Sequence, residues 1–432
     1  MSDSLINSVE TKPKLAPKLR FPEFEKDGDW EEKTLGEVAE RIEDKVNGKQ
    51  LTTASISAGI GFVSQAEKFS RDISGDQYKN YIVLNEGEFS YNKGNSKRFP
   101  QGCIYKLKEF KQVAVPNAFI SFRFKPNFIG DFFQGYFDNN YHGRQLQQFI
   151  TSGARMDGLL NIRAKDFFSI VLPTPSKPEQ EKIAGCLSSL DEMINANKEK
   201  LEALKAHKKG LMQNLFPQEG QTIPTYRFPE FENYGEWMEK KLGELLEFKN
   251  GINASKEQYG KGIKFINVMD ILSNELITYE KIIGSVDVSK EIVEKFSVEY
   301  GDILFQRSSE TQEEVGSANV YIDNNKTATF GGFVIRGKKI GHYDPLFLNV
   351  LLKTKEVRNS ISSRAGGSTR YNVGQEVLST TKILIPLIEE QNRIASCLSS
   401  LDDLIKSQTK KIEQLHNHKK GLMQGLFPKN LD

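Results

Sequence analysis

This sequence has few cysteines, no long apolar run and almost equal numbers of positive and negative charges. The three cysteines among 432 residues form no CxxC pair, which argues against a disulfide framework or a zinc site and favours a reducing compartment. No apolar run approaches the roughly 18 residues that a membrane helix requires. Residues 1–18 are polar and lack the apolar core of a signal peptide. We therefore expect a soluble, cytoplasmic protein with a flexible N-terminal tail over residues 1–18 and no membrane partner.

Recognisable catalytic motifs are missing as well. A DNA amino-methyltransferase requires an Asp/Asn-Pro-Pro-aromatic motif, and the nearest match, residues 344–347, lacks the second proline. The sequence has no GxxxxGK[ST] phosphate loop. Residues 31–33 fit half of a nuclease motif, but no aspartate stands at a suitable distance before them, and the five histidines do not group. We therefore expect no catalytic residue, no metal site and no cofactor bound by this chain.

An internal repeat is the strongest feature of the sequence. RFPEFE occurs at Arg20–Glu25 and again at Arg227–Glu232. Cys186–Pro217 aligns with Cys397–Pro428 at an offset of 211, with 20 identities in 32 positions. The middles of the halves have diverged, but an offset of 214 still aligns 86–93 with 300–307, and it also places Gly102, Ala114 and Phe119 opposite Gly316, Ala328 and Phe333. A duplicated frame with diverged centres predicts one scaffold that holds two different readers.

The closing segment of each half is predicted to be a long helix. Apolar residues step by four and three, as in the seam of a coiled coil, and prolines flank each segment of about 37 residues, or roughly 55 Å. Asn197 and Gln408 interrupt the seam in the same layer, and Lys208 and Lys419 in another. An amphipathic helix packed on its own domain is the alternative. The seam residues are Ile183, Leu187, Leu190, Ile194, Leu201, Leu204 and Leu211 in the first helix, and Ile394, Leu398, Leu401, Ile405, Ile412, Leu415 and Leu422 in the second.

The middles, roughly 31–175 and 238–386, have the pattern of an α+β fold rich in strands. Runs of β-branched and aromatic residues between glycine and asparagine predict strands, and a helical pattern covers 346–355. The expected strands are 119–124, 264–269, 302–305 and 333–335.

These motifs together resemble the specificity subunits of type I restriction–modification systems, over nearly the whole chain beyond the tail. RFPEFE…W…LGE resembles the family's entry to each target-recognition domain. The EQxxIA…LSSLD…KKGLMQxLF pattern at 179–216 and 390–427 resembles its helical spacers, and the glycine-rich turn 366–372 resembles its end-of-domain motif. In the first half the turn 152–157 is shorter and less typical.

The resemblance implies an α+β fold with two pseudo-twofold-related target-recognition domains joined by two long antiparallel coiled-coil spacer helices. It places the first domain at 19–175, the central spacer at 176–217, the second domain at 218–386 with a linker at 218–226, and the distal spacer at 387–428. Each domain would read one half of a bipartite, asymmetric site in double-stranded DNA, and the spacers would set the gap.

The resemblance also assigns all chemistry to partner subunits. Two methyltransferase subunits would dock on this chain and transfer a methyl group from S-adenosylmethionine to N6 of adenine. Restriction subunits, where a system has them, would add cleavage that depends on ATP and Mg²⁺. A coiled-coil adaptor that binds protein alone, or a self-sufficient methyltransferase or nuclease with unusual motifs, are the alternative interpretations.

Candidate DNA contacts lie in four polar segments. The net charge of +2 requires any nucleic-acid surface to be local or shared with partners. Arg and Lys read guanine edges and Asn and Gln read adenine edges, although the same residues also hold phosphates. Solvated hairpin tips and a turn that braces the helix are the alternatives. The candidates are Tyr91, Asn92, Lys93, Asn95, Lys97, Arg98 and Arg155 in the first half, and Gln306, Arg307, Ser308, Ser309, Thr369, Arg370, Tyr371 and Asn372 in the second.

Overall fold

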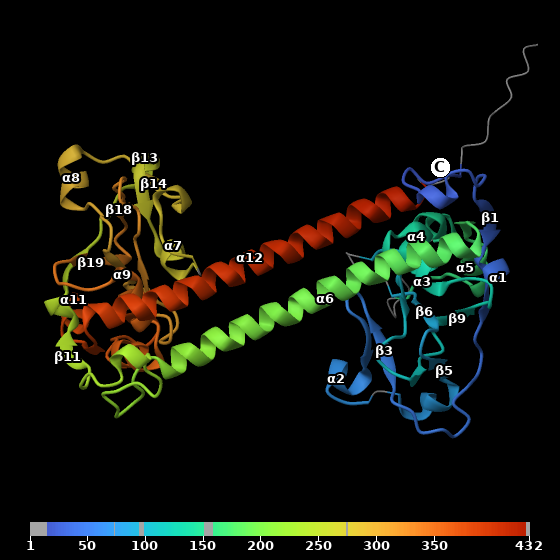
Figure 1. Ribbon diagram of the computed structural model, residues 1–432, viewed down its shortest axis with the longest axis horizontal. Coiled ribbons are helices and arrows are strands. Elements are labelled where there is room, and N and C mark those ends of the chain that lie inside the picture. Colours follow the sequence, from blue (N-terminus) through green and yellow to red (C-terminus); the bar gives the residue numbers. More distant parts are fainter. Residues whose placement is uncertain (1–14, 73, 95–98, 151–158, 274, 429–432) are drawn as a thin grey trace, which may run out of the picture. The chain divides into compact units, whose positions relative to one another are not determined.

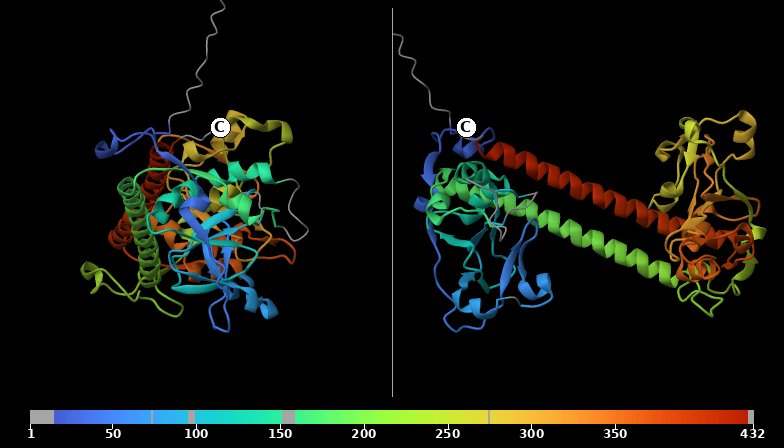
Figure 2. Two further views of the ribbon diagram at one scale, coloured as in Figure 1. Left: turned by 90° about the vertical axis from the view of Figure 1, so that its right-hand side faces the viewer. Right: turned by 180° about the vertical axis from the view of Figure 1, so that it is seen from behind.

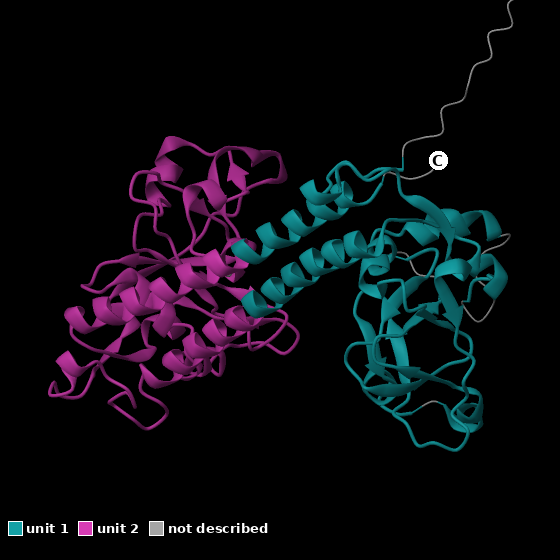
Figure 3. Cartoon of the chain, turned by 45° about the vertical axis from the view of Figure 1, so that its right-hand side comes forward, with its two compact units in different colours: residues 1–198, 411–432 teal, residues 199–410 magenta. Residues whose placement is uncertain are grey.

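The computed structural model describes residues 15–72, 74–94, 99–150, 159–273 and 275–428. The chain forms two compact units, residues 1–198 with 411–432 (unit 1) and residues 199–410 (unit 2), which Figure 3 shows in different colours. The boundary between the units crosses both long helices, α6 (Lys177–Asn214) and α12 (Ile388–Leu426). Each unit therefore contains one diverged middle and a part of both helices.

The central sheets of the two units have the same topology. In unit 1 the antiparallel order is β2-β9-β6-β7, and in unit 2 it is β12-β19-β15-β17. The strands are β2 (Ala39–Arg41), β9 (Ile120–Phe124), β6 (Phe89–Asn92) and β7 (Cys103–Lys106), and β12 (Leu246–Asn250), β19 (Val334–Lys339), β15 (Ile303–Gln306) and β17 (Ala318–Val320). The prediction that the middles share a fold is confirmed, as is the α+β class with two long helices.

A two-stranded antiparallel ribbon joins the entry of each middle to its exit. In unit 1, β1 (Glu31–Thr34) pairs with β10 (Val171–Thr174). In unit 2, β11 (Met238–Lys241) pairs with β21 (Lys382–Ile385). The last strand of each ribbon is followed directly by a long helix. The two ends of each middle therefore lie side by side.

Outside the central sheet, each middle has a second group of strands and short helices, which we call its outer lobe. The outer lobes differ between the units, as Figure 1 shows. Unit 1 has two two-stranded antiparallel sheets, β3-β4 and β5-β8, and the short α2 (Gln65–Phe69), whereas unit 2 has a three-stranded sheet in which β13 pairs with β18 in parallel. The unit 1 strands are β3 (Ala54–Ser57), β4 (Gly61–Ser64), β5 (Ile82–Asn85) and β8 (Gln112–Val115). The unit 2 elements are β13 (Tyr259–Ile266), β14 (Ser285–Val286), β18 (Thr329–Phe330), α7 (Val268–Leu272) and α8 (Lys290–Lys295).

The main core of each unit packs between the central sheet, three short helices and the ends of the long helices. In unit 1, Phe427 just after α12 stacks on Phe132 and contacts Tyr136, with ring centroids 5.4 and 4.7 Å apart. A Cβ atom on Gly135 would lie 2.2 Å from the Phe427 ring, so this close approach requires glycine. The short helices are α3 (Gly130–Asp138), α4 (Tyr141–Leu146) and α5 (Ala164–Phe168), and α9 (Pro345–Leu351), α10 (Lys355–Ser362) and α11 (Gln375–Ser379).

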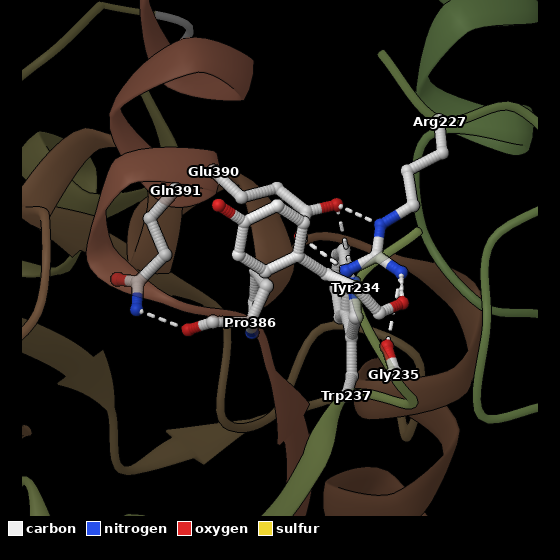
Figure 4. Close-up of polar contacts among 7 residues, drawn as sticks. All are labelled: Arg227, Tyr234, Gly235, Trp237, Pro386, Glu390 and Gln391. Atoms are coloured by element: carbon white, nitrogen blue, oxygen red, sulfur yellow. Dashed lines mark hydrogen bonds and ion pairs between the residues drawn. The ribbon is translucent and has the colours of Figure 1, made fainter. Parts of the chain in front are cut away.

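A buried arginine–glutamate pair fastens the RFPEFE segment to the first turn of a long helix in each unit. In unit 2, Arg227 Nε and Nη2 donate to the two carboxylate oxygens of Glu390 at 2.8 and 2.6 Å (Figure 4). Arg20 makes the same bidentate contact with Glu179 in unit 1, at 2.8 Å for both bonds. The glutamates are 1% exposed. The adjacent glutamine, Gln391, donates to the Pro386 carbonyl at 2.8 Å and accepts from the Asp344 amide at 3.0 Å.

The long helices pair antiparallel within each unit through equivalent ion pairs. Lys419 Nζ donates to Asp191 at 2.6 Å in unit 1, and Lys208 Nζ donates to Asp402 at 2.5 Å in unit 2. Asp191 and Asp402, and likewise Lys208 and Lys419, are 211 positions apart, so each pair joins the aspartate of one repeat to the lysine of the other. The prediction that Lys208 and Lys419 share one layer is wrong, because Lys208 lies in unit 2 and Lys419 in unit 1, each beside an aspartate of the other repeat. Figure 2 shows the two helices side by side in each unit.

Residues of the predicted seam pack in the main cores of the two units as well as between the two long helices. Ile183 and Leu187 belong to the main core of unit 1, and Ile394 and Leu398 to that of unit 2. Buried seam residues are Ile183, Leu187, Ile194, Ile394, Leu398, Leu401 and Ile412; the others, Leu190, Leu201, Leu204, Leu211, Ile405, Leu415 and Leu422, are half-buried. Among the described residues, no helix is long and apolar enough to cross a membrane.

Two predicted elements differ from the structure. The strand expected at 264–269 ends at Ile266, because Asn267 and Asp270 form a capping box that starts helix α7. The helix expected at 346–355 is two helices, since α9 ends at Leu351 and Thr354 precedes the first turn of α10. The strands predicted at 119–124, 302–305 and 333–335 correspond to β9, β15 and the start of β19.

The buried ion pair of unit 2 should be far more important for stability than an exposed pair. Removing one partner leaves an uncompensated buried charge, so Arg227→Met should lower the free energy of unfolding by about 3–5 kcal/mol, measured by denaturant unfolding. The double variant Arg227→Met/Glu390→Leu should recover much of this loss. Lys382→Met removes an exposed pair with Glu239 and should cost at most about 1 kcal/mol. Equal effects of the two single variants would contradict this account.

A buried histidine in unit 1 should make stability depend on pH. Burial beside Tyr91 and Phe137 lowers the pKa of His142 to about 4, with the backbone of Gly102 opposing the shift. The unfolded chain takes up this proton below about pH 6.5, so the contribution is present above that pH and is lost as the pH falls towards 4. Between pH 7 and pH 5 the loss should be about 2 kcal/mol.

The measurement is the free energy of unfolding of His142→Leu at both pH values. This variant should lose about 2 kcal/mol less than wild type over that interval. The matched control is His207→Leu, at an exposed position of α6, which should follow wild type. An unchanged pH dependence in a folded His142→Leu protein would contradict the assignment.

Candidate nucleic-acid interface

In unit 2 the structure brings together two polar segments that lie more than 60 residues apart. Strand β16 (Ser308–Ser309) pairs antiparallel with β20 (Tyr371–Asn372). The Ser308 hydroxyl donates to the Asn372 side-chain oxygen at 2.5 Å. The Val373 amide donates to the Arg307 carbonyl at 3.0 Å, and the Arg307 amide donates to the Phe333 carbonyl at 2.9 Å. Three segments of unit 2 are thus fixed together around Arg307.

The exposed side of this junction carries two arginines and an aromatic ring. Arg307 is half-buried and donates through Nη1 to the Gly332 carbonyl at 3.3 Å. Arg370 is exposed, and its guanidinium carbon lies 5.9 Å from the centre of the Phe333 ring. We call this the arginine surface; it consists of Arg307, Ser308, Phe333, Thr369, Arg370 and Asn372.

Unit 1 has the corresponding junction. The Leu160 amide donates to the Lys93 carbonyl at 2.9 Å, and Gly94 forms an antiparallel bridge with Leu159. Lys93 is 214 positions before Arg307, and Leu160 is 213 positions before Val373, so the backbone contacts are equivalent. The other candidates of this half, Asn95, Lys97, Arg98 and Arg155, lie outside the described residues.

The side chain of the neighbouring Asn92 makes hydrogen bonds only with backbone groups among the described residues. Its side-chain oxygen accepts from the Gly94 amide at 2.8 Å, and its amide nitrogen donates to the Ile56 carbonyl at 3.3 Å. Gly102, with a φ of +80°, approaches so closely that a Cβ atom would lie 2.4 Å from the Asn92 carbonyl oxygen. Asn92 therefore shapes the turn from Asn92 to Gly94 that contains Lys93.

Three candidates are buried in the structure, which argues against a direct contact with DNA. Tyr91 is fully buried, donates to the Gln101 carbonyl at 2.7 Å and stacks on Phe167; burial also raises its pKa. Gln306 is 3% exposed and donates to the Ser308 carbonyl at 3.0 Å. Ser309 is buried and donates to Glu314 at 3.0 Å. Both faces of β6 and β15 are covered, and Ser309 is the buried residue of β16, so polarity alone did not identify exposed positions.

Sequence reasoning missed Phe333, which it placed in a strand without a role. The structure places it before β19, in the turn that follows β18, with an exposed ring. The glycine pair Gly331-Gly332 directly before it is the sequence signal for a tight turn that could have excluded a buried strand position.

The chemistry of the arginine surface is that of a polyanion or base-edge contact. Guanidinium groups bind phosphates and guanine edges through paired hydrogen bonds, and the adjacent hydroxyl and amide groups add neutral donors and acceptors. Across the described part of the chain, no group of three or more His, Cys, Asp or Glu side chains is arranged to hold a metal ion.

Comparisons with known proteins identify relatives over most of the chain. The profile of the type I restriction modification DNA specificity domain matches residues 27–206 and again residues 234–417. The type I restriction enzyme MjaVIII specificity subunit of Methanocaldococcus jannaschii is 25% identical over 66% of this chain and 68% of its own length. The type I restriction enzyme StySPI specificity subunit of Salmonella potsdam is 24% identical over 89% of this chain and 79% of its own.

Solved structures share the fold. The type I restriction-modification S subunit from M. genitalium matches with a TM-score of 0.53 at 15% identity, over 96% of this chain and all of that chain. A chain from a study of complex assembly and conformational transition of the type I R-M system matches with a TM-score of 0.54 at 17% identity, over 93% of this chain and 98% of that one.

Proposed function

Because this chain belongs to the family of type I restriction–modification DNA specificity proteins, we propose that each of its two units reads one half of a bipartite, asymmetric DNA site. The chain is the DNA-recognition component of such a system and not its catalytic component. Residues 19–175 and 218–386 would be the reading domains, and residues 176–217 and 387–428 would be the spacer helices.

One observation carries the proposal: the backbone junctions around Lys93 and Arg307 are equivalent, but the side chains at them differ. Lys93 and Gly94 stand where Arg307 and Ser308 stand in unit 2. The same scaffold thus presents a different set of donors in each unit, which is what a reader of two unlike half-sites requires. In unit 2 the proposed contacts are Arg307, Ser308, Thr369, Arg370 and Asn372.

The partners follow from the family rather than from any site on this chain. Two methyltransferase subunits would dock on the spacer helices and domains, and would transfer a methyl group from S-adenosylmethionine to adenine in each half-site. A restriction subunit would use ATP and Mg²⁺ for cleavage. The adenine must leave the base stack for this reaction, so the present chain would position DNA and its partners would supply the reacting groups.

The two readers should act independently. We expect Arg307→Ala to change the preference at one position of one half-site and Lys93→Ala to change the other half-site, because equivalent junctions lie in separate units. If Arg307 binds a guanine edge, its loss should cost about 1–3 kcal/mol at that position. If it holds a phosphate, all sites should weaken evenly and the salt dependence should fall by about one unit of slope.

The measurement is methylation of a randomised-site library by the complex of this chain with its methyltransferase partner and S-adenosylmethionine. The chain alone serves as the blank and should give no turnover. Lys382→Ala, at an exposed site of the ribbon in unit 2, is the matched control and should keep wild-type preference. A wild-type complex without a split motif would overturn the proposed function. A folded variant that alters both half-sites would overturn the independence of the readers.

The long helices should act as a ruler for the gap between half-sites. Duplicating residues 194–200 in α6 and 405–411 in α12 adds one heptad to each helix and keeps the layers aligned. The added length is about 10.5 Å, or roughly three base pairs at about 3.4 Å each. Methylation mapping should therefore show the same half-sites with a gap about three base pairs longer.

The matched control exchanges residues 194–200 with 405–411 without changing the helix lengths. This variant should keep the wild-type gap. An active lengthened variant with an unchanged gap would refute the ruler and leave the assignment of the two readers intact.

A further inference from the structure

Phe333 is an exposed aromatic residue on a firmly held turn of unit 2. Its side chain is 60% exposed. Its carbonyl accepts from the Arg307 amide at 2.9 Å, the Val334 amide donates to Gly331 at 2.8 Å, and the Gly331 amide donates to the Ile266 carbonyl at 3.0 Å. The backbone around the ring is thus closed by a hydrogen bond within the turn and tied to two other segments.

The turn before Phe333 lies directly against neighbouring segments. A Cβ atom on Gly251 would lie 2.2 Å from the Gly331 carbonyl oxygen, so the two backbones are in close contact there. A Cβ atom on Gly332 would lie 1.9 Å from the Asn253 side-chain oxygen, so this side chain packs against the turn. The ring therefore projects from a position that the rest of the unit determines.

The fold does not require an exposed ring at this position. Strand pairing aligns β9 and β19 at an offset of 215, since Tyr91 pairs with Ile120 and its counterpart Phe305 pairs with Ile335. The position equivalent to Phe333 is therefore Ala118, which carries no ring. The exposed ring of unit 2 thus has no counterpart at this position in unit 1 and calls for a different explanation.

The surroundings of Phe333 indicate what it meets. The Arg370 guanidinium lies over the ring at 5.9 Å, and the Arg307 guanidinium donates to the Gly332 carbonyl beside it. Arginines on such a surface bind phosphates or base edges, whereas an apolar ring gains nothing from a phosphate. On DNA held by these two arginines, the favourable neighbour for the ring is a base, against which aromatic side chains stack, pack on a thymine methyl or wedge between steps.

We propose that Phe333 makes a direct apolar contact with a base of the half-site read by unit 2, so that one position is read by the ring and not by hydrogen bonds. The inference rests on the proposed function, since it needs unit 2 to be a DNA reader. It adds a specificity-determining residue that no polar motif in the sequence marks.

The test is the site preference of Phe333→Ala, measured with the same methyltransferase complex on the same randomised library. We expect a loss of about ten-fold in preference at one position of one half-site. The salt dependence should stay at the wild-type slope, because a neutral side chain displaces no counterions. Phe333→Leu keeps an apolar group without the flat ring, is expected to lose less, and gives a second readout if the alanine variant folds poorly.

A cycle with modified DNA separates direct contact from an indirect effect. Replacing the base at the affected position by an abasic analogue should weaken binding by wild type, but should have little further effect on Phe333→Ala, because groups in contact do not contribute additively. Fully additive effects of the two changes would overturn the contact.

Ile340→Ala is the matched control, since Ile340 is 58% exposed and lies just past the other end of β19, roughly 20 Å away at about 3.3 Å per residue. This variant should keep the wild-type preference. If wild type reads a split site and Phe333→Ala retains its full preference, this inference fails alone. If wild type reads no split site, the proposed function and this inference fail together.

Discussion

The buried pair of Arg227 and Glu390, with its counterpart Arg20 and Glu179, is the interaction on which each unit depends. The glutamate stands in the first turn of a long helix, where the helix dipole favours a negative charge. The arginine satisfies both carboxylate oxygens and also donates to carbonyls of the turn that follows RFPEFE, Tyr234 and Gly235 in unit 2. A charge pair buried in this way is costly to form and costlier to break, so the helix start, the turn and the entry strand must be placed together.

The neighbouring glutamine extends this constraint to the reading domain. Gln391 joins the first turn of α12 to the end of β21 at Pro386 and to the start of α9 at Asp344. Gln180 does the same in unit 1, through Pro175 and Ile129. Two consecutive residues of the spacer motif thus determine how a sheet and its covering helices lie against the helix end. The central sheets could diverge in sequence while this attachment stayed the same.

The two long helices were predictable from the sequence because their heptad pattern repeats many times. The boundary between a strand and a short helix, which a single capping residue determines, was not. The heptad pattern extends over more than 25 residues, so its signal exceeds any single substitution. By contrast, the strand expected at 264–269 fails at Asn267, where the side chain caps a helix and overrides the β propensity of Val268. The capping box with Asp270 is visible in the sequence, but it competes there with an equally good strand pattern.

The candidate site was predictable as a set of segments but not as a surface. Residues 306–309 and 369–372 were identified separately, and nothing local to either indicates that β16 and β20 pair. Residues 306–309 differ in their burial. Gln306 and Ser309 are buried in the unit, whereas Arg307 between them is half-buried. Phe333 was missed because an aromatic residue before Val334 and Ile335 has the composition of a core strand. Its exposure depends on the glycine turn and on packing against segments far away in sequence.

The ribbons β1–β10 and β11–β21 bring the first and the last strand of each middle together, so each middle is an insertion with adjacent ends. Paired strands lie about 4.8 Å apart, so the chain leaves each domain almost where it entered. Each middle is a loop closed by its ribbon, and the entropic cost of closing such a loop grows only slowly with the number of residues in it. The hydrogen bonds of the ribbon offset this cost and do not depend on the sequence between the two strands. A domain of different size or surface could replace the present one by an exchange of sequence within the ribbon, provided that it keeps the side chains that pack against the helix ends. In such a chain, recombination between the ribbon strands can change the DNA half-site that a unit reads in one step. Point substitutions would have to pass through intermediate chains that bind DNA more weakly.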